Sequence, residues 1–462
     1  MAILETITSA KFVFTFLLCA ILILLSVYTG IITYRADQKE NTEAVALNKK
    51  DLESKPNFAT LASFGTKINR PPHVLSVIAS GVDEAVGRVT TVNIAYDPNL
   101  VDSKYGSNPV FSVFGALDLT FIVKIILSLF AILFTYDAIV GEKERGTLKL
   151  ILSNKVPRDQ VILGKFIGGY ISLVIPLIVP LILSLLFFLV IPNISLSGQD
   201  WGRLLLMFLI FFLYLSVFFT LGLFISARTK KSSTSFLVLL FIWVIFVTII
   251  PKISVLVASQ LKPIPSIHEI TAKKDAFFQQ IQGGLQKAAL DWTKANAPKR
   301  GDDPKVYLEK AHKWLEDVQQ EMTKKIEEYD SALERDFQAK KRAQVALAIN
   351  ISRISPASAL TFSTMSLART GLDEYEQVLA SIRAYKRIFS KWAGAKMIKN
   401  MDFQSGDMGN KVVLDDMPKF EFDQETLAES LVRTLPDIGL MILLIIVFFA
   451  GAYISFLKYD VR

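Results

Sequence analysis

Six stretches of the chain are apolar over about 20 residues, the length of helix that crosses the hydrocarbon core of a bilayer. The first is followed by Tyr34 and Arg35 without a small-residue cleavage site, so we interpret it as a retained helix and not as a signal peptide. The N-terminal segment 1–33 therefore includes the first span. The predicted spans are 12–33, 116–140, 166–192, 204–226, 234–258 and 435–457.

The positive charges of the short loops predict the orientation of these spans. The loop 141–165 carries six Lys and Arg residues and the loop 227–233 carries three, whereas the turn 193–202 carries none. Because short loops rich in Lys and Arg stay in the cytoplasm, both basic loops are predicted to be cytoplasmic. We therefore expect a multi-pass protein of the cell (inner) membrane with both termini in the cytoplasm, including the C-terminal tail 458–462.

This orientation leaves two long segments, 34–115 and 259–434, outside the cytoplasm. The second contains two long runs in which apolar residues recur every three or four positions, a pattern typical of paired helices. Between the runs, the stretch 297–304 (APKRGDDP) breaks both patterns, and its two aspartates are suited to cap the second helix. We predict an antiparallel helical hairpin. The residues predicted to form its seam are Phe277, Ile281, Leu285, Ala288, Trp292 and Ala295, and Leu308, Ala311, Leu315, Val318, Met322, Ile326, Tyr329, Leu333 and Phe337.

Two other outer stretches have recognisable patterns. The segments 74–81 and 87–96 are rich in β-branched residues, which favours one or two strands. The stretch 372–392 begins with acidic and ends with basic residues, as suits a helix dipole. This helix lies either on the outer leaflet or a substrate, or, as we favour, against the hairpin. The predicted fold is an all-α membrane protein of six transmembrane helices with a large, mainly helical extracytoplasmic domain, a long antiparallel hairpin and a few short strands.

Composition excludes several classes of protein. The 462 residues are 52% hydrophobic and 20% charged, so part of the chain stands in water. The excess of 51 Lys and Arg over 43 Asp and Glu suits loops near anionic lipid, and no basic and aromatic patch indicates a nucleic-acid partner. The single cysteine, Cys19, and three scattered histidines suggest neither a disulfide framework nor a metal site. A membrane enzyme is the least favoured class, because no carboxylate pair or Ser-His set indicates catalytic residues.

The stretch 136–170 is the most informative one, because it is charged, then apolar, then charged again between two spans. Gly146 and Thr147 are suited to begin a short helix, which Leu148 continues and Pro157 ends. Such a helix can act as a rigid handle that moves both neighbouring spans. An interfacial helix that only covers the membrane surface is an equally good interpretation of the pattern alone.

The run GEKERGTLKLILSN, followed by KVPRDQVILGKFIGG, resembles the signature E-x-E-x-G-T-L and S-x-P-V-x-R-x-x-x-x-x-G-K of ABC-2 type permeases. Lys155 departs from it, since the family often has proline or a small residue there. The resemblance implies that this loop contains the coupling helix, which docks in a groove of the ATPase subunit. By position, the docking residues are Glu142, Glu144, Gly146, Thr147 and Leu148, and the residues of the loop return are Pro157, Arg158, Gly164 and Lys165.

Two further stretches, 108–123 and 351–371, resemble a subfamily whose permeases carry large extracytoplasmic insertions, some of them from copper-enzyme maturation systems. The chain has no G-x-x-x-x-G-K-[ST] loop, because Gly164-Lys165 is followed by Phe166 and lacks the upstream glycine. We therefore expect no directly bound cofactor, and ATP to act through separate ABC ATPase subunits. The resemblance also implies a second permease copy or a related permease as partner.

Charged residues near the spans are candidates for a substrate pathway, since charge in lipid is costly. Asp118, at the outer end of the second span, is the first candidate, although a position so close to the interface favours contact with water. Our functional hypothesis is the permease subunit of an ATP-driven exporter. The alternative is an ABC-type mechanotransmission or scaffolding protein, in which the same motion works a periplasmic or envelope partner through the hairpin without transport.

Overall fold

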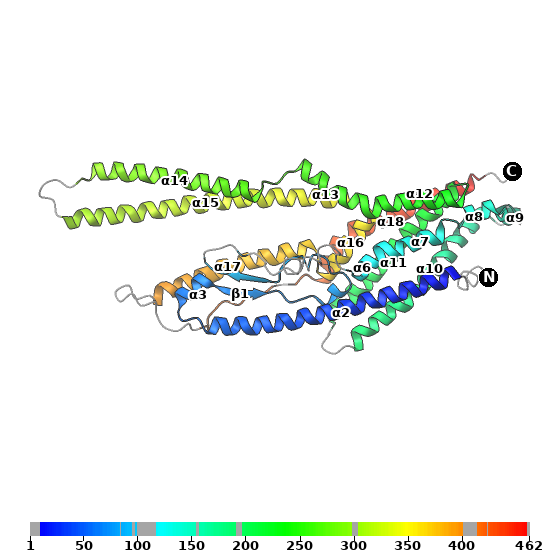
Figure 1. The fold of residues 1–462 in the computed structure, drawn as a ribbon, viewed down its shortest axis with the longest axis horizontal. Helices are drawn as coiled ribbons and strands as arrows, with labels where there is room; N and C mark the ends of the chain where they lie inside the picture. The colour runs from blue at the N-terminus through cyan, green and yellow to red at the C-terminus, as the bar shows by residue number, and fades with distance from the viewer. Residues whose placement is uncertain are drawn as a thin grey trace. The chain divides into compact units, whose positions relative to one another are not determined.

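The computed structural model describes residues 10–83, 85–94, 98, 117–153, 157–190, 196–297, 304–400, 414–422 and 424–459 (Figure 1). These residues form two compact units. One consists of residues 1–249 and 353–462, and the other of residues 250–352. Of the stretches with predicted roles, most of 108–123, the two aspartates of 297–304, and Lys155 lie outside the described residues.

Among the described residues, six helices are long and apolar enough to cross a membrane, which confirms the predicted number of spans. Two of them contain a π-helical turn, η2 (Val123–Leu127) and η3 (Ile245–Ile249). The six helices are built from α2 (Ala10–Glu53), α6 (Leu119–Ile122) with η2 and α7 (Ser128–Thr135), α10 (Arg158–Val190), α11 (Gly198–Arg228), α12 (Ser232–Val244) with η3 and α13 (Ile250–Leu261), and α18 (Leu427–Leu457).

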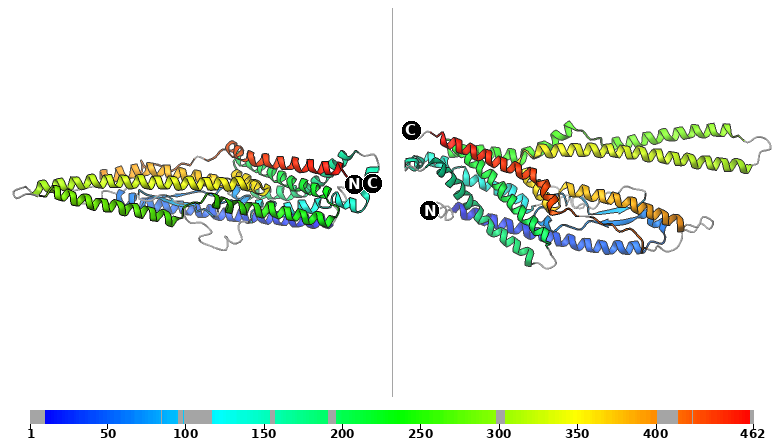
Figure 2. Two further views of the ribbon diagram at one scale, coloured as in Figure 1. Left: turned by 90° about the horizontal axis from the view of Figure 1, so that it is seen from above. Right: turned by 180° about the vertical axis from the view of Figure 1, so that it is seen from behind.

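Helix α11 lies at the centre of the first unit and packs against α18, α16 (Pro356–Ala368) and α7. Figure 2 shows α18, in red, along this bundle. The large side chains of Tyr214 and Phe218 on α11 are fully buried. A side chain at Gly222 would collide with Thr135 of α7, because a Cβ atom there would lie 1.8 Å from the threonine hydroxyl oxygen. Glycine thus permits the close approach of these two helices.

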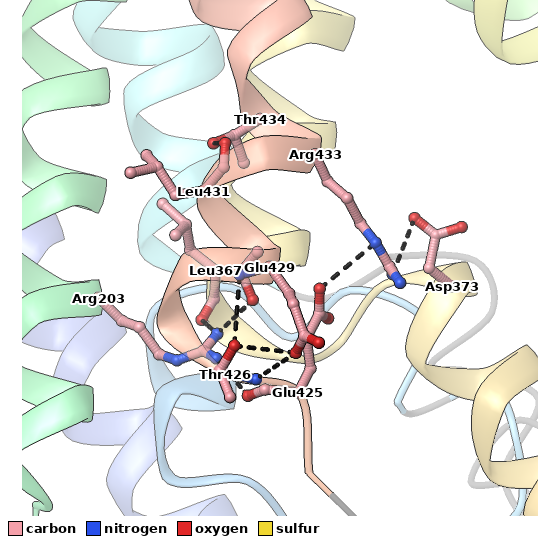
Figure 3. A network of polar contacts seen from close by, with 10 residues as sticks. Arg203, Leu367, Asp373, Glu425, Thr426, Glu429, Leu431, Arg433 and Thr434 are labelled. Atoms are coloured by element: carbon pink, nitrogen blue, oxygen red, sulfur yellow. Dashed lines mark hydrogen bonds and ion pairs between the residues drawn. The ribbon is translucent and has the colours of Figure 1, made fainter.

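A buried arginine joins the start of α11, the end of α16 and the start of α18. Arg203 of α11 donates hydrogen bonds to the carbonyl of Leu367 (3.0 Å), the hydroxyl of Ser430 (2.8 Å) and the carbonyl of Glu425 (2.7 Å) (Figure 3). Helix α18 begins beside it with a capping box, in which Thr426 and Glu429 satisfy each other's backbone N–H groups. The arginine therefore fixes the start of α18 against α11 and α16.

The part of this unit beside these helix ends contains the short elements. They are α3 (Phe58–Phe64), β1 (Thr66–Asn69), the 3₁₀ turn η1 (Val74–Val77), β2 (Val89–Val92) and α17 (Leu372–Asn400). The strands β1 and β2 form an antiparallel pair in which Thr66 lies opposite Val92. The prediction of a strand within 87–96 is confirmed by β2, whereas the strand predicted at 74–81 is wrong. That stretch is a 3₁₀ turn whose apolar side chains, Leu75 and Val77, are buried in the main core.

The apolar face of α17 packs on α3 and β2. Val378, Ile382 and Phe389 of this face are buried in a second hydrophobic cluster with Phe58 and Leu61 of α3. The apolar side chains of α17 are therefore covered by a short helix and a strand of the same unit. A contact between α17 and the hairpin stays a prediction.

The second unit contains the predicted hairpin, formed by α14 (Ile267–Ala295) and α15 (Pro304–Ser352). Its ring pairs follow an antiparallel order, since Phe277 stacks on Tyr329 at 3.9 Å and Trp292 on Trp314 at 5.4 Å between ring centroids. The predicted seam is wrong at Ala288, Ala295, Leu308 and Leu315, which are exposed. On α15, Tyr307 and Trp314 take the seam positions predicted for Leu308 and Leu315, because their aromatic rings pair with Trp292 of α14.

Candidate functional site

The loop singled out by the sequence contains two short helices, α8 (Val140–Glu144) and α9 (Thr147–Ser153). Gly146 separates them with a positive φ of 71°, and its N–H donates to the carbonyl of Lys143. Glycine adopts this left-handed conformation without the steric cost of a side chain, so it ends α8 sharply. The loop therefore consists of two helices joined at a fixed angle, which together with the ends of the helices they contact we call the loop junction.

The start of α8 is held by a side chain from α11. The hydroxyl of Ser226 accepts hydrogen bonds from the backbone N–H groups of Ile139 (3.0 Å) and Val140 (3.1 Å), and Ser226 is fully buried. The first N–H groups of a helix lack partners within that helix. Ser226 supplies one, and so attaches α8 to the end of α11.

Lys143 of α8 binds the same end of α11. Its ammonium donates to the carbonyls of Ala227 and Thr229, at 3.3 Å for the latter, and lies 5.0 Å from the ring centroid of Tyr459. The last carbonyls of a helix carry partial negative charge and lack helical donors. Lys143 therefore caps α11 while it is part of α8.

Glu144 connects α8 to α12. Its carboxylate accepts a hydrogen bond from the backbone N–H of Ser232, at 3.1 Å, and another from the Ser232 hydroxyl. Ser232 is the first residue of α12, so a negative charge lies at the positive end of that helix dipole. The glutamate is itself exposed, and it binds the start of the fifth span.

The return of the chain into α10 is tied to both sides. Lys165 of α10 forms an ion pair with Glu142, at 2.6 Å, and donates to the carbonyl of Ala138 at 2.8 Å. Arg158, the first residue of α10, donates to the carbonyls of Leu457 (2.5 Å) and Tyr459 (3.2 Å) at the end of α18. The loop junction therefore joins α8 to α10, α11 and α12, and α10 to α18.

The remaining predicted loop residues have fewer contacts. Leu148 is fully buried in the main core, whereas Gly146 and Thr147 are exposed. Pro157 is exposed directly before α10, and a Cβ atom at Gly164 would meet nothing within 4 Å. Leu150 of α9 is 67% exposed, so a large apolar side chain of the short helix faces away from the protein.

Sequence reasoning missed Lys143, Ser226, Ser232 and Leu150. Lys143 lies within the charged loop, but its spacing gave no reason to separate it from the other basic residues. Ser232 follows a basic run at the start of an apolar stretch, a position where serine often begins a helix. Nothing in the sequence around Ser226 indicates that its hydroxyl reaches a helix far away in the chain.

Asp118 lies at the start of α6, where its carboxylate caps the helix. One oxygen accepts from the N–H of Phe121 (2.7 Å), and the other from the N–H (2.9 Å) and hydroxyl (3.1 Å) of Ser80. These contacts fix segment 78–82 to the second span. Among the described residues, no group of three or more His, Cys, Asp or Glu is arranged to hold a metal ion.

Six helices that are long and apolar enough to cross a membrane, with a charged junction that ties the ends of four of them, are the features of a multi-pass membrane protein. The sequence model of the ABC-2 family of transporter proteins matches residues 1–461. The chain belongs to this family. The predicted resemblance to ABC-2 permeases is therefore confirmed.

Two relatives are similar to a short part of the chain. A probable ABC transporter permease protein NosY of Pseudomonas aeruginosa is 50% identical over 50 residues, which are 11% of this chain and 18% of that protein. The protein of the same name from Stutzerimonas stutzeri is 54% identical over 43 residues, 9% of this chain and 16% of that protein. The chain thus matches less than a fifth of the length of these relatives.

Proposed function

We propose that this chain is the permease subunit of an ATP-driven ABC-2 exporter, in which a separate subunit hydrolyses ATP. Membership of the ABC-2 family and the six apolar helices support a transporter subunit. The loop junction is the observation that supports an ATP-driven exporter with a separate ATPase subunit. In this junction, one short segment is joined by hydrogen bonds and an ion pair to the ends of three other spans. Both NosY relatives bear the name of probable permeases, which agrees with this role.

We assign different tasks to the residues that the family signature groups together. Gly146, Thr147 and the exposed Leu150 form the surface that docks on the ATPase subunit. Leu148 anchors α9 in the core, since its side chain is fully buried. Glu142 and Glu144 are bound to Lys165 and Ser232 of neighbouring spans, so they transmit movement from the docking surface to those spans.

Force on α9 reaches the spans through these contacts. Because Gly146 joins α9 to α8 through one tight turn, a push on α9 moves α8. Glu144 then displaces the start of α12, and Glu142 displaces the start of α10. Arg158 carries the displacement of α10 to the end of α18. The spans of α10, α12 and α18 thereby respond to one docking event, as alternating access or extrusion of a substrate requires.

The assembly we propose contains two permease chains, identical or related, and two ABC ATPase subunits in the inner membrane. The basic loops 141–165 and 227–233 support a cytoplasmic position for the loop junction and for both termini. No residue of this chain has a catalytic role in the proposal. The partner subunit binds and hydrolyses ATP.

A specific observation also favours the second candidate function, ABC-type mechanotransmission. Helix α12, which Glu144 holds at its start, continues through η3 into residue 250, where the second unit begins. The hydroxyl of Ser355 donates to the carbonyl of Phe246 within η3. The span Ser232–Leu261 is continuous, so movement of α12 reaches α13, from which the chain leads into the hairpin. The same docking event can therefore move the hairpin against an envelope partner without transport.

The docking assignment is tested by charge at the exposed leucine. Leu150→Asp places a carboxylate on the docking surface, and we expect it to abolish co-purification of the ATPase subunit from membranes. Leu308→Asp is the matched control, because Leu308 is 64% exposed on the hairpin and outside the loop. Equal recovery of the ATPase subunit with both variants would overturn the docking assignment. If Leu150→Asp abolishes co-purification of the ATPase subunit but leaves transport unchanged, mechanotransmission is favoured.

A further inference from the structure

A cleft of about 380 Å³ lies in the first unit, apart from the loop junction. Its walls are formed by α2, strand β1 and segment 414–420, with Tyr385 of α17 between them. The lining includes the apolar side chains of Val45 and Leu52. Its volume falls in the range of about 300–1,000 Å³ that is typical of binding clefts.

The cleft follows the edge of a strand. All four residues of β1, Thr66–Asn69, line it, although successive side chains of a strand point to opposite faces. Lining by both faces requires that the cleft runs along the edge between them. In the part of the chain that the structure describes, β1 pairs with β2 on one side, and no strand pairs with its other edge. Asn48 of α2 donates a hydrogen bond to the side chain of Asn69 at 3.0 Å, so α2 lies beside the strand.

The charged side chains that line the cleft are all basic. Lys49, Lys67 and Lys419 line it, and no carboxylate of a described residue does. Lys49 lies 3.9 Å from Glu53 in an exposed pair, whereas Lys67 and Lys419 form no ion pair with any described residue. The Tyr385 hydroxyl donates to the carbonyl of Pro418 at 2.8 Å, and burial raises the pKa of this tyrosine to about 12, so it remains uncharged.

We propose that this cleft binds an extended, acidic peptide segment of a partner protein, which adds to β1 as a third strand. Backbone hydrogen bonds to the strand edge supply affinity that is independent of sequence. The apolar walls receive alternate side chains of the segment, and the lysines select for acidic residues beside them. The site is thus an interaction surface for an anionic, strand-forming peptide, and it does not depend on the function proposed for the loop junction.

The test measures fluorescence anisotropy of a short labelled peptide that alternates valine and glutamate, with the full chain in nanodiscs of neutral lipid. We expect saturable binding. The same peptide N-methylated at alternate backbone nitrogens keeps its charge but cannot complete a strand ladder, so we expect it not to bind. A peptide that alternates valine and lysine should not bind either.

The double variant Lys67→Glu and Lys419→Glu should weaken binding by at least about tenfold, since like charges face each other across the interface. Lys50→Glu is the matched control, because Lys50 is exposed on α2 and does not line the cleft; we expect it to bind like the parent. Thermal unfolding of both variants should match the parent.

Three outcomes would overturn the proposal. Equal binding of the N-methylated peptide would show that charge attraction holds the peptide and that it does not add to β1 as a strand. Competition by anionic phosphatidylglycerol nanodiscs, with no effect of N-methylation, would make the cleft a lipid site. Failure of the glutamate peptide to bind would show that the cleft is not a peptide site. The lysines would then serve only to protect the strand edge against aggregation.

Discussion

The carboxylate of Glu144 accepts hydrogen bonds from both the backbone N–H and the hydroxyl of Ser232, and thereby joins the loop helix α8 to the first residue of α12. The two residues are 88 positions apart in the chain. A bond of this kind fixes the relative position of two elements that an ATPase subunit would otherwise move independently. Its removal should separate docking from movement.

Glu144→Ala is expected to leave the ATPase subunit bound and to abolish ATP-driven transport, because movement of the docking surface no longer reaches α12. The loss of a helix cap also lowers the free energy of unfolding by about 1 kcal/mol. Ser232→Ala retains the backbone N–H donor, so its effect should be smaller. Pull-down of the ATPase subunit and transport in proteoliposomes measure the two properties separately. Loss of binding in Glu144→Ala would show that this residue docks instead of transmitting movement.

Gly146 should tolerate asparagine better than valine. At φ 71° a β-branched residue costs roughly 1–2 kcal/mol, whereas asparagine adopts this conformation more readily. No atom lies within 4 Å of a Cβ at this position, so the cost is conformational and not steric contact with neighbours. We expect Gly146→Val to weaken ATPase binding and Gly146→Asn to retain most of it. Similar loss in both variants would indicate that the turn geometry is not what matters.

Arg203 is expected to be essential for the stability of the junction at which it joins the ends of α11, α16 and α18. Arg203→Met removes donors from two buried carbonyls and one hydroxyl, and a single hydrogen bond to a charged group contributes about 1.5–3 kcal/mol. The thermal unfolding temperature of the purified chain should fall markedly. Ser430→Ala, which removes one of the three acceptors, is the matched comparison and should cause a smaller decrease. An unchanged unfolding temperature in Arg203→Met would contradict the role we give this network.

Glu425 makes the stability of the same junction depend on pH. Burial raises the pKa of its carboxyl above the ordinary value, although Arg433, 3.3 Å away, opposes the shift. The folded state therefore favours the protonated acid, and ionisation costs stability as the pH rises from the ordinary value past the raised pKa. Glu425→Gln should unfold at a higher temperature than the parent above this window and at the same temperature below it. The backbone carbonyl that Arg203 binds is unaffected by this change. An advantage that grows on acidification would contradict the assigned direction.

The spans and the hairpin could be predicted from the sequence because long apolar runs and heptad spacing are local signals. The spacing does not determine the hairpin seam, since Leu308 and Leu315 fit it as well as Tyr307 and Trp314 do. Ring pairing with Trp292 decides between them, and that contact joins residues from different helices. The strand predicted at 74–81 failed for a related reason, because burial in the main core and not β-propensity determines its conformation.

The loop was identified by its signature, but the task of each residue was not. The spacing of Glu142 and Glu144 indicates that both belong to one motif, and only the structure shows that they bind Lys165 and Ser232. The exposure of Leu150 next to the buried Leu148 depends on where α9 sits against the core. Such information lies in contacts between residues distant in the chain, which no local pattern encodes.

The most direct test of the account is site-specific cross-linking from α9 to the ATPase subunit. Because Cys19 is the only cysteine, Cys19→Ala gives a background without thiols, into which Leu150→Cys or Leu308→Cys introduces one. The chain is expressed with the ATPase subunit, and a photoactivatable thiol reagent is attached in inverted membrane vesicles. The account predicts an adduct between the ATPase subunit and residue 150 and none with residue 308. An intact complex without an adduct at residue 150, or an equal adduct at residue 308, would contradict it.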